Sequence, residues 1–273
     1  MQNQRVLVLD FGGQYNQLIA RRVRECNVYC EVKPHSMTID EIKAYDPIGI
    51  IFTGGPQSVY AAGSPQVDAK IFELGIPVLG ICYGCQLMAH YLGGEVTAAQ
   101  SDTAREYGKT PTFFDTDCRL FKGLPEESVT WMSHGDYMAK VPESFRLVAH
   151  SAACPTVGIC DEARGFYGVQ FHPEVNHTEY GQKMLHNFLY EVCGAKGDWT
   201  MGDYMRASIE SIRRQGRRRT RCCWRSPAAL IPPSRRRCSP RLSAISSPAF
   251  SSITASCARM RATRSKRRSK TGI

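Results

Sequence analysis

The segment PVLGICYGCQLMAHYLGG, residues 77–94, places a cysteine between two glycines where an apolar run ends and a helical pattern begins. Gly80, Cys82 and Gly84 follow the G-x-nucleophile-x-G spacing of a strand-to-helix elbow, with cysteine in the place of serine. The glycines have no Cβ atom that would clash in so tight a turn. The N–H groups at the start of the following helix favour a thiolate over a thiol. The pattern predicts that Cys82 is an activated nucleophile.

Three other interpretations of Cys82 compete with this one. A free cysteine is more often a small, inert core residue. Cys82 and Cys85 also form a C-x-x-C pair, but a thioredoxin-like motif follows the first strand of its domain and this pair follows the fourth. A zinc site is the weakest of the three, because no second pair of ligands stands at a suitable spacing.

A base for the thiol is found in GFYGVQFHPEVNH, residues 165–177. We expect residues 167–171 to form a strand, with His172 and Glu174 at its end. Residues two apart in an extended chain project to the same side, and Pro173 stiffens the backbone between them. Glu174 can then hold one imidazole nitrogen while the other faces the thiol. A surface histidine beside a proline is the alternative, and the three features together favour the base.

A glycine pair in IFTGGPQSV, residues 51–59, follows another predicted strand. Backbone N–H groups at Gly54 and Gly55 could approach a developing oxyanion, because ligands of parallel sheets bind beyond the carboxyl ends of the strands. A single Gly-Gly-Pro run is more often a turn. The FGGQ run, residues 11–14, fits neither the dinucleotide-binding nor the Walker spacing.

The elements that must position these residues alternate between strand and helix in the first half of the chain. Apolar runs predict strands at 5–10, 28–32, 48–55 and 77–81, and helical spacing predicts helices at 14–26, 38–44 and 66–74. From about 95 to 170 the pattern changes to short alternating strands, and a helix is expected near 178–192. This predicts an α/β fold, a mainly parallel sheet flanked by helices with an added antiparallel section.

Charge is distributed unevenly along the 273 residues. The formal net charge is +10, but residues 211–273 hold 18 Lys and Arg and no Asp or Glu. The first 210 residues hold 17 basic and 25 acidic residues, a net charge of −8, which is typical of a metabolic enzyme. The net positive charge of the chain therefore comes from residues 211–273, its C-terminal tail.

The composition also indicates the compartment. The N-terminus lacks the basic and apolar blocks of a signal peptide, and no apolar run approaches the ~20 residues of a membrane span. The 12 cysteines are scattered through a long chain with no export signal, so we expect most to be reduced and buried. We expect a cytoplasmic protein with no membrane partner.

With Cys82, His172, Glu174 and the segment 53–56 in order, the chain resembles a class I glutamine amidotransferase. Within that family it is similar to the amidotransferase domain of GMP synthases, through YNQLIARRVRE (15–25), REYG (105–108), SHGD (133–136) and GDWTM (197–201). The resemblance covers about residues 4–210. Its motifs are highly specific in combination, although each alone is modest.

The resemblance implies a mechanism. Cys82 would attack the side-chain carboxamide of glutamine, and His172, oriented by Glu174, would protonate the departing ammonia and then activate water. The N–H groups of Gly55 and Tyr83 would hold the oxyanion. The remaining candidates for gripping the substrate are Gly54, Gln86, Ser133, His134, Gly135 and Asp136. No metal or cofactor is expected in this chain, because ATP and Mg²⁺ would serve a synthetase domain, an ATP pyrophosphatase that adenylates xanthosine monophosphate.

We therefore expect residues 1–205 to form the amidotransferase domain and residues 206–215 to begin a linker. The synthetase domain should follow, but residues 216–273 are rich in Arg, Ser, Pro and Ala with no sustained apolar period. This composition predicts a disordered tail. A nucleic-acid-binding tail is the alternative, for which dense arginine is the usual signature.

Codon arithmetic supports a shifted reading frame in the tail. If the third base of each codon is read with the first two of the next, Trp224 and Arg225 give alanine. SPAALIPPS then permits L-S-G-G-V-D-S-S-V, the nucleotide-binding loop expected of an ATP pyrophosphatase, and SITASCARMRATRSK permits V-D-H-G-L-L-R-K-N-E-G-D-E-V-E. Two such runs in order are hard to obtain by chance. Whether the shift is biological or a sequencing error stays open.

The predicted function is hydrolysis of glutamine to glutamate and ammonia, the ammonia-supplying half of GMP synthesis from XMP, without the synthetase activity. The expected partners are glutamine and, in the intact family protein, the ATP pyrophosphatase domain; nucleic acid is not expected. Two rivals remain. One is another Cys-dependent hydrolase of the same fold, acting on γ-glutamyl compounds. The other is a non-catalytic module whose basic tail binds nucleic acid.

Overall fold

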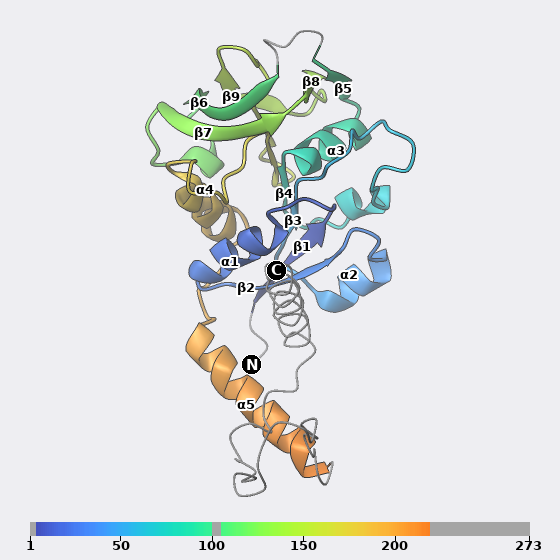
Figure 1. Cartoon of the computed structure of the whole chain (residues 1–273), viewed down its shortest axis with the longest axis vertical. Coiled ribbons are helices and arrows are strands. Elements are labelled where there is room, and N and C mark those ends of the chain that lie inside the picture. Colours follow the sequence, from blue (N-terminus) through green and yellow to red (C-terminus); the bar gives the residue numbers. More distant parts are fainter. Residues whose placement is uncertain (1–3, 100–104, 219–273) are drawn as a thin grey trace, which may run out of the picture. The chain divides into compact units, whose positions relative to one another are not determined.

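The computed structural model describes residues 4–99 and 105–218 (Figure 1). Residues 4–201 form one compact unit, and helix α5 (Met201–Arg218) belongs to a second unit. Most of the predicted tail, from residue 219 onward, lies outside the described residues. Within the described ranges, no helix is long and apolar enough to cross a lipid bilayer.

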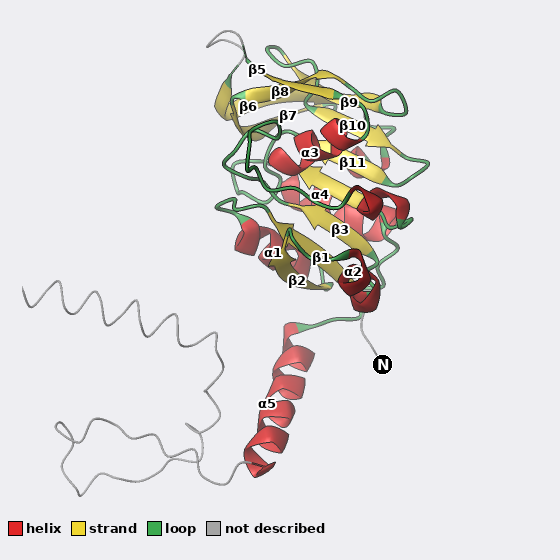
Figure 2. Ribbon diagram, turned by 90° about the vertical axis from the view of Figure 1, so that its right-hand side faces the viewer, coloured by secondary structure: helices red, strands yellow, loops and turns green. Residues whose placement is uncertain are grey.

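A nine-stranded sheet runs through the first unit, in the order β2-β1-β3-β4-β11-β10-β9-β6-β7 (Figure 2). The parallel part consists of β2 (Tyr29–Pro34), β1 (Arg5–Asp10), β3 (Gly49–Phe52), β4 (Val78–Ile81) and β11 (Phe166–Val169). The antiparallel part consists of β10 (Gly158–Asp161), β9 (Arg146–Ser151), β6 (Glu106–Phe114) and β7 (Glu127–His134). A separate pair joins β5 (Glu95–Ala98) to β8 (Asp136–Lys140). The predicted α/β fold with an antiparallel section is confirmed.

Apolar side chains are buried on both faces of the parallel strands. Alternate residues of β1 enter two different core clusters, Val6 and Val8 on one face and Leu7 and Leu9 on the other. Figure 1 shows α1 (Asn16–Glu25) and α4 (Gly181–Asn187) on one side of the sheet, and α2 (Ile39–Tyr45) and α3 (Tyr83–Tyr91) on the other. Continuous apolar runs are what a sheet covered on both faces requires.

Three predicted elements differ from the structure in their extent. The helix expected at 66–74 is a shorter 3₁₀ helix, η1 (Ala69–Glu73); it begins after Asp68, whose carboxylate caps it by accepting a hydrogen bond from Lys70 N–H at 3.0 Å. The helix expected at 178–192 begins at Gly181 as α4 and continues as a π-helical turn, η4 (Phe188–Val192). The strand expected at 167–171 ends at Val169.

The cysteines among the described residues are free thiols. Eight are present in these ranges, and seven of them are buried. This agrees with the expectation of reduced, mostly buried cysteines.

Candidate active site

Cys82 stands at the turn between β4 and α3. Its φ of 52° and ψ of −108° are strained for a residue with a side chain, which is typical of a nucleophile on a strand-to-helix elbow. A Cβ atom on Gly80 would lie 2.6 Å from the carbonyl oxygen of Gly84, and one on Gly84 would lie 2.5 Å from Phe52 Cβ. Only glycine fits at either position, so the predicted tight turn is confirmed.

Backbone hydrogen bonds fix this elbow to the neighbouring strands. The N–H of Cys82 donates to the carbonyl of Val169 at 2.8 Å, and the N–H of Gly84 donates to the carbonyl of Thr53 at 3.1 Å. Tyr83 provides the first amide of α3, which has no acceptor within its own helix. An amide at the start of a helix, outside the helix's own hydrogen-bond ladder, is suited to binding an oxyanion.

Two segments distant in sequence from the elbow, around Ser133 and around residues 170–172, meet at the Cys82 sulfur. Its thiol lies 3.8 Å from the carbonyl oxygen of Ser133, to which it can donate, and the Gln170 amide donates to the sulfur at 3.7 Å. His172 also hydrogen-bonds to Cys82. Cys82 is 8% exposed, so the group is enclosed by these segments without being completely buried.

The imidazole of His172 is held between Cys82 and Glu174. Its Nδ1 lies 2.8 Å from Glu174 Oε1, which leaves Nε2 for the sulfur. Burial of the ring lowers the pKa of His172, but hydrogen bonds and charge from Cys82 and Glu174 outweigh that effect and raise the pKa to about 10. The surroundings of the ring therefore favour its protonated form.

The backbone around His172 differs from the extended chain that we expected. Residues 173 and 174 form a turn. Two hydrogen bonds hold the backbone N–H and the backbone carbonyl of His172, just before this turn. The N–H of His172 donates to the carbonyl of Trp131 at 3.0 Å, and the hydroxyl of Thr178 donates to the carbonyl of His172 at 2.6 Å. Glu174 still reaches the ring, because the turn folds its carboxylate back.

Gly54 and Gly55 lie against Cys82, His172 and the start of α3. A Cβ atom on Gly54 would lie 3.3 Å from His172 Cε1 and 3.8 Å from Cys82 Cβ, and one on Gly55 would lie 3.0 Å from Tyr83 Cγ. The loop therefore follows the site closely. Such an approach is what an oxyanion-binding backbone requires.

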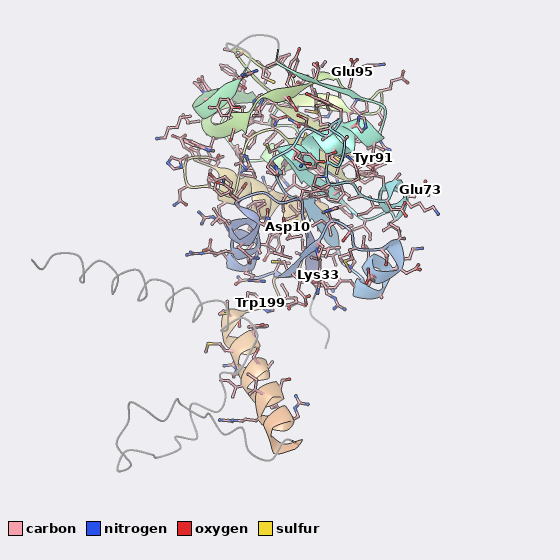
Figure 3. All side chains as sticks on the ribbon, turned by 45° about the vertical axis from the view of Figure 1, so that its right-hand side comes forward. Asp10, Lys33, Glu73, Tyr91, Glu95 and Trp199 are labelled. Carbon is pink, nitrogen blue, oxygen red and sulfur yellow. The ribbon has the colours of Figure 1, made fainter. Side chains whose placement is uncertain are left out.

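The FGGQ run supports that loop. Asp10, labelled in Figure 3, ends β1 and accepts a hydrogen bond from Gly12 N–H at 2.7 Å. Gly12 faces Pro56, and the N–H of Phe11 donates to the hydroxyl of Thr53 at 3.1 Å. The sequence pattern assigned no role to the FGGQ run. These contacts show that it supports the loop at Gly54 and Gly55.

The Ser133–Asp136 segment joins β7 to β8 beside the sulfur. Gln86, on α3, donates one amide hydrogen to the carbonyl of Asp136 at 2.9 Å and the other to Gln170 Oε1 at 3.0 Å. His134 is buried, and its two ring nitrogens face Asp136 O and Glu106. The sequence candidates Gln86, Ser133, His134, Gly135 and Asp136 are thus brought together.

Sequence reasoning missed three residues of this arrangement. Gln170 contacts both the sulfur and Gln86; its place at the end of β11, two residues before His172, is the signal that could have found it. Tyr60 donates from its hydroxyl to Asp136 Oδ1 at 3.2 Å. Glu106 belongs to the REYG run that carried the resemblance but was given no role.

A cavity of about 380 Å³ adjoins the His172–Glu174 segment. Tyr15 in its wall packs edge-on against His172, with ring centroids 5.4 Å apart. Its lining residues are Tyr15, Leu18, Arg21, Arg22, Trp131, Val175, Asn176 and His177. Cys82 is not among them.

Two clusters among the described residues place three potential metal-ligand atoms within 4.8 Å of one another: Glu106, His134 and Cys154, and Cys118, Cys160 and Glu162. In the first cluster Glu106 and His134 hydrogen-bond to each other at 3.2 Å. In the second cluster the Arg146 guanidinium lies 3.2 Å from the Glu162 carboxylate. The carboxylate is therefore already paired with a cation of the protein. We assign no metal to either.

Curated relatives match most of the chain. A GMP synthase [glutamine-hydrolyzing] of Clostridium botulinum is 54% identical over 215 residues, which are 79% of this chain and 41% of the relative. One of Acetivibrio thermocellus is 56% identical over 213 residues, 78% of this chain and 41% of the relative. The chain spans about two fifths of the length of these curated relatives.

Solved structures share the fold. The crystal structure of a GMP synthase component from Thermoplasma acidophilum is 33% identical with a TM-score of 0.63, and covers 71% of this chain and 96% of that one. A glutamine amidotransferase of Thermotoga maritima, 18% identical with a TM-score of 0.56, covers 71% of this chain and 100% of that one and supports the fold alone. The sequence profile of the family Glutamine amidotransferase class-I matches residues 7–192. The chain that carries this elbow therefore belongs to the class I glutamine amidotransferases, and its curated relatives are GMP synthases.

Proposed function

We propose that this domain hydrolyses glutamine to glutamate and ammonia, with Cys82 as nucleophile, His172 as acid and base, and Glu174 as the group that orients His172. The observation that carries the proposal is the meeting of the strained Cys82 with the His172–Glu174 pair at the ends of β4 and β11. The family to which the chain belongs gives the substrate class.

In the first half of the reaction, the Cys82 thiolate attacks the carboxamide carbon of glutamine and forms a C–S bond. The carbonyl electrons move to oxygen, and the N–H groups of Gly55 and Tyr83 bind that oxyanion. The His172 imidazolium gives its proton to the amide nitrogen, the C–N bond breaks, and ammonia leaves. A glutamyl thioester remains on Cys82.

In the second half, neutral His172 removes a proton from water, and the resulting hydroxide attacks the thioester. The C–S bond breaks, glutamate leaves, and the thiolate–imidazolium pair is restored. Glu174 stabilises the charged ring in both halves, which agrees with the high pKa of His172, about 10 despite burial that lowers it. The sum is glutamine plus water giving glutamate plus ammonia.

The wider reaction is also a proposal. The names of the relatives suggest that the ammonia serves amination of XMP by an ATP pyrophosphatase domain, with ATP and Mg²⁺ as its cofactors. The family profile ends at residue 192, and residues 216–273 contain no acidic residue and no nucleotide-binding loop in the frame given. We therefore propose that this chain releases ammonia without completing GMP synthesis.

Glutamate release by the purified chain tests the proposal. We expect activity that Cys82→Ala abolishes and that Cys85→Ala, three residues further along α3, retains. We also expect no GMP from XMP, ATP, Mg²⁺ and ammonia.

Equal glutamate release by the wild type and Cys82→Ala would refute the catalytic role. Loss of activity in both cysteine variants would favour a C-x-x-C mechanism instead. Hydrolysis of γ-glutamyl peptides in preference to free glutamine would assign the chain to another hydrolase of the same fold.

A further inference from the structure

A buried polar cluster lies where three antiparallel strands meet near the active site. Glu106 begins β6, His134 ends β7 and is its partner in the ladder, and Ser151 ends β9. The hydroxyl of Ser151 donates to Glu106 Oε1 at 2.6 Å, and His134 Nε2 lies 3.2 Å from Glu106 Oε2. All three residues are more than nine-tenths buried.

Both ring nitrogens of His134 face acceptors within the protein. Nδ1 lies 3.1 Å from the carbonyl oxygen of Asp136, and Nε2 lies 3.2 Å from Glu106 Oε2. Each ring nitrogen therefore has a partner, which is the condition for a stable buried polar group.

This cluster is connected to the nucleophile by hydrogen bonds. The Asp136 carbonyl that accepts from His134 also accepts from the Gln86 amide at 2.9 Å. Gln86 donates in turn to Gln170, and Gln170 donates to the Cys82 sulfur at 3.7 Å. The turn that contains His134 is therefore fixed at one end by Glu106 and contacts the site at the other.

We propose that Glu106 and His134 are positioning residues for glutamine hydrolysis, whose buried pair fixes the Ser133–Asp136 turn beside the Cys82 sulfur. The proposal rests on the proposed glutaminase function. Both ring nitrogens of His134 have partners within the protein, so neither faces the substrate. His134 instead acts by holding the backbone of the Ser133–Asp136 turn in place. The catalytic role stays with Cys82, and the pair acts on substrate binding through the turn.

The test compares Glu106→Ala with Glu106→Gln in steady-state glutamate release. Alanine leaves His134 without its partner, so the turn loosens, and we expect KM to rise tenfold or more with kcat within threefold of the wild type. Glutamine can donate to Nε2 and accept from Ser151, so we expect KM within threefold of the wild type. Glu127→Ala, an exposed position in the same pair of strands, is the matched control.

A wild-type KM in folded Glu106→Ala would overturn the proposal, and so would a failure of Glu106→Gln to restore KM. Should Glu106→Ala not fold, Ser151→Ala removes one hydrogen bond to Glu106, and we expect a rise in KM of about threefold; no rise would overturn the proposal.

Alkylation of Cys82 by iodoacetamide separates this proposal from the proposed function. We expect Glu106→Ala to change the alkylation rate and Glu127→Ala not to, whether or not glutamine is hydrolysed. A wild-type chain that releases no glutamate but shows this difference would refute the glutaminase, while showing that the Glu106–His134 pair still fixes the turn beside Cys82. Identical alkylation rates in all three proteins would refute the positioning role.

Discussion

Replacing Glu174 by glutamine would remove one charge from the site while keeping the size of the side chain. In the wild type, burial lowers the pKa of His172, and hydrogen bonds and charge from Cys82 and Glu174 raise it from 6.5 to about 10. That rise corresponds to roughly 5 kcal/mol in favour of the charged ring, because one pH unit in pKa is worth about 1.4 kcal/mol.

Glu174 supplies one hydrogen bond and one charge effect, and Cys82 supplies the same two kinds. Glutamine loses the charge of the carboxylate but can keep its hydrogen bond, so we expect the pKa of His172 to fall by about one to two pH units, roughly 2 kcal/mol. The glutamine oxygen can still accept from Nδ1, so the ring should keep its orientation.

The assay is kcat/KM for glutamate release as a function of pH. His172 must carry a proton to give to the departing ammonia, so the rate falls as the pH rises through its pKa. We expect this alkaline limb to move down by about one to two pH units in Glu174→Gln. Glu191→Gln, an exposed partner of Lys122, should leave it in place. If kcat/KM of Glu174→Gln and of the wild type fell at the same alkaline pH, the reasoning would be refuted.

Three further predictions concern stability and support of the site. Gly84→Ala would place a Cβ atom 2.5 Å from a side-chain carbon of β3, so we expect the free energy of unfolding in urea to fall by about 1–3 kcal/mol; an unchanged value would show that the elbow has room. The pKa of His172 is raised on folding to about 10, so its contribution to stability is full below pH 6.5 and is lost as the pH rises through 10. The difference in unfolding free energy between wild type and His172→Gln should shrink over that window, and a constant difference would contradict the linkage. Arg22 donates to the backbone carbonyl of Glu174 at 3.0 Å, so Arg22→Ala should lower kcat severalfold, whereas its neighbour Arg21, which pairs with Glu25 on the surface of α1, should tolerate alanine; equal rates in both variants would count against this support.

The elbow and the parallel strands could be predicted because their signals are local. The glycine spacing around Cys82 indicates a turn that forms within five residues, and the apolar runs indicate strands that are buried on both faces. The same holds for α2, where Thr38 and Glu41 form a capping box at the predicted start. Local sterics and hydrogen bonding decide these features, so the sequence alone indicates them.

The meeting of Cys82 with His172 depends on long-range pairing that no local pattern specifies. β11 returns from the antiparallel section to lie parallel to β4, with Val169 opposite Ile81. That register brings Gln170 to the sulfur, and the ladder of β6 with β7 brings Glu106 to His134. Tertiary packing selects Gln170 and Glu106 as partners, which explains why sequence patterns alone assigned neither of them a role.

The central claim is that Cys82 carries the glutamyl group during hydrolysis, and acid-quenched single turnovers analysed by mass spectrometry test it most directly. The account predicts one glutamyl acyl group on the peptide that contains Cys82, absent in Cys82→Ala and strongly reduced in His172→Gln, because His172 supplies the proton to the departing ammonia. A glutamyl group on a different cysteine, or glutamate release by Cys82→Ala at the wild-type rate, would contradict it.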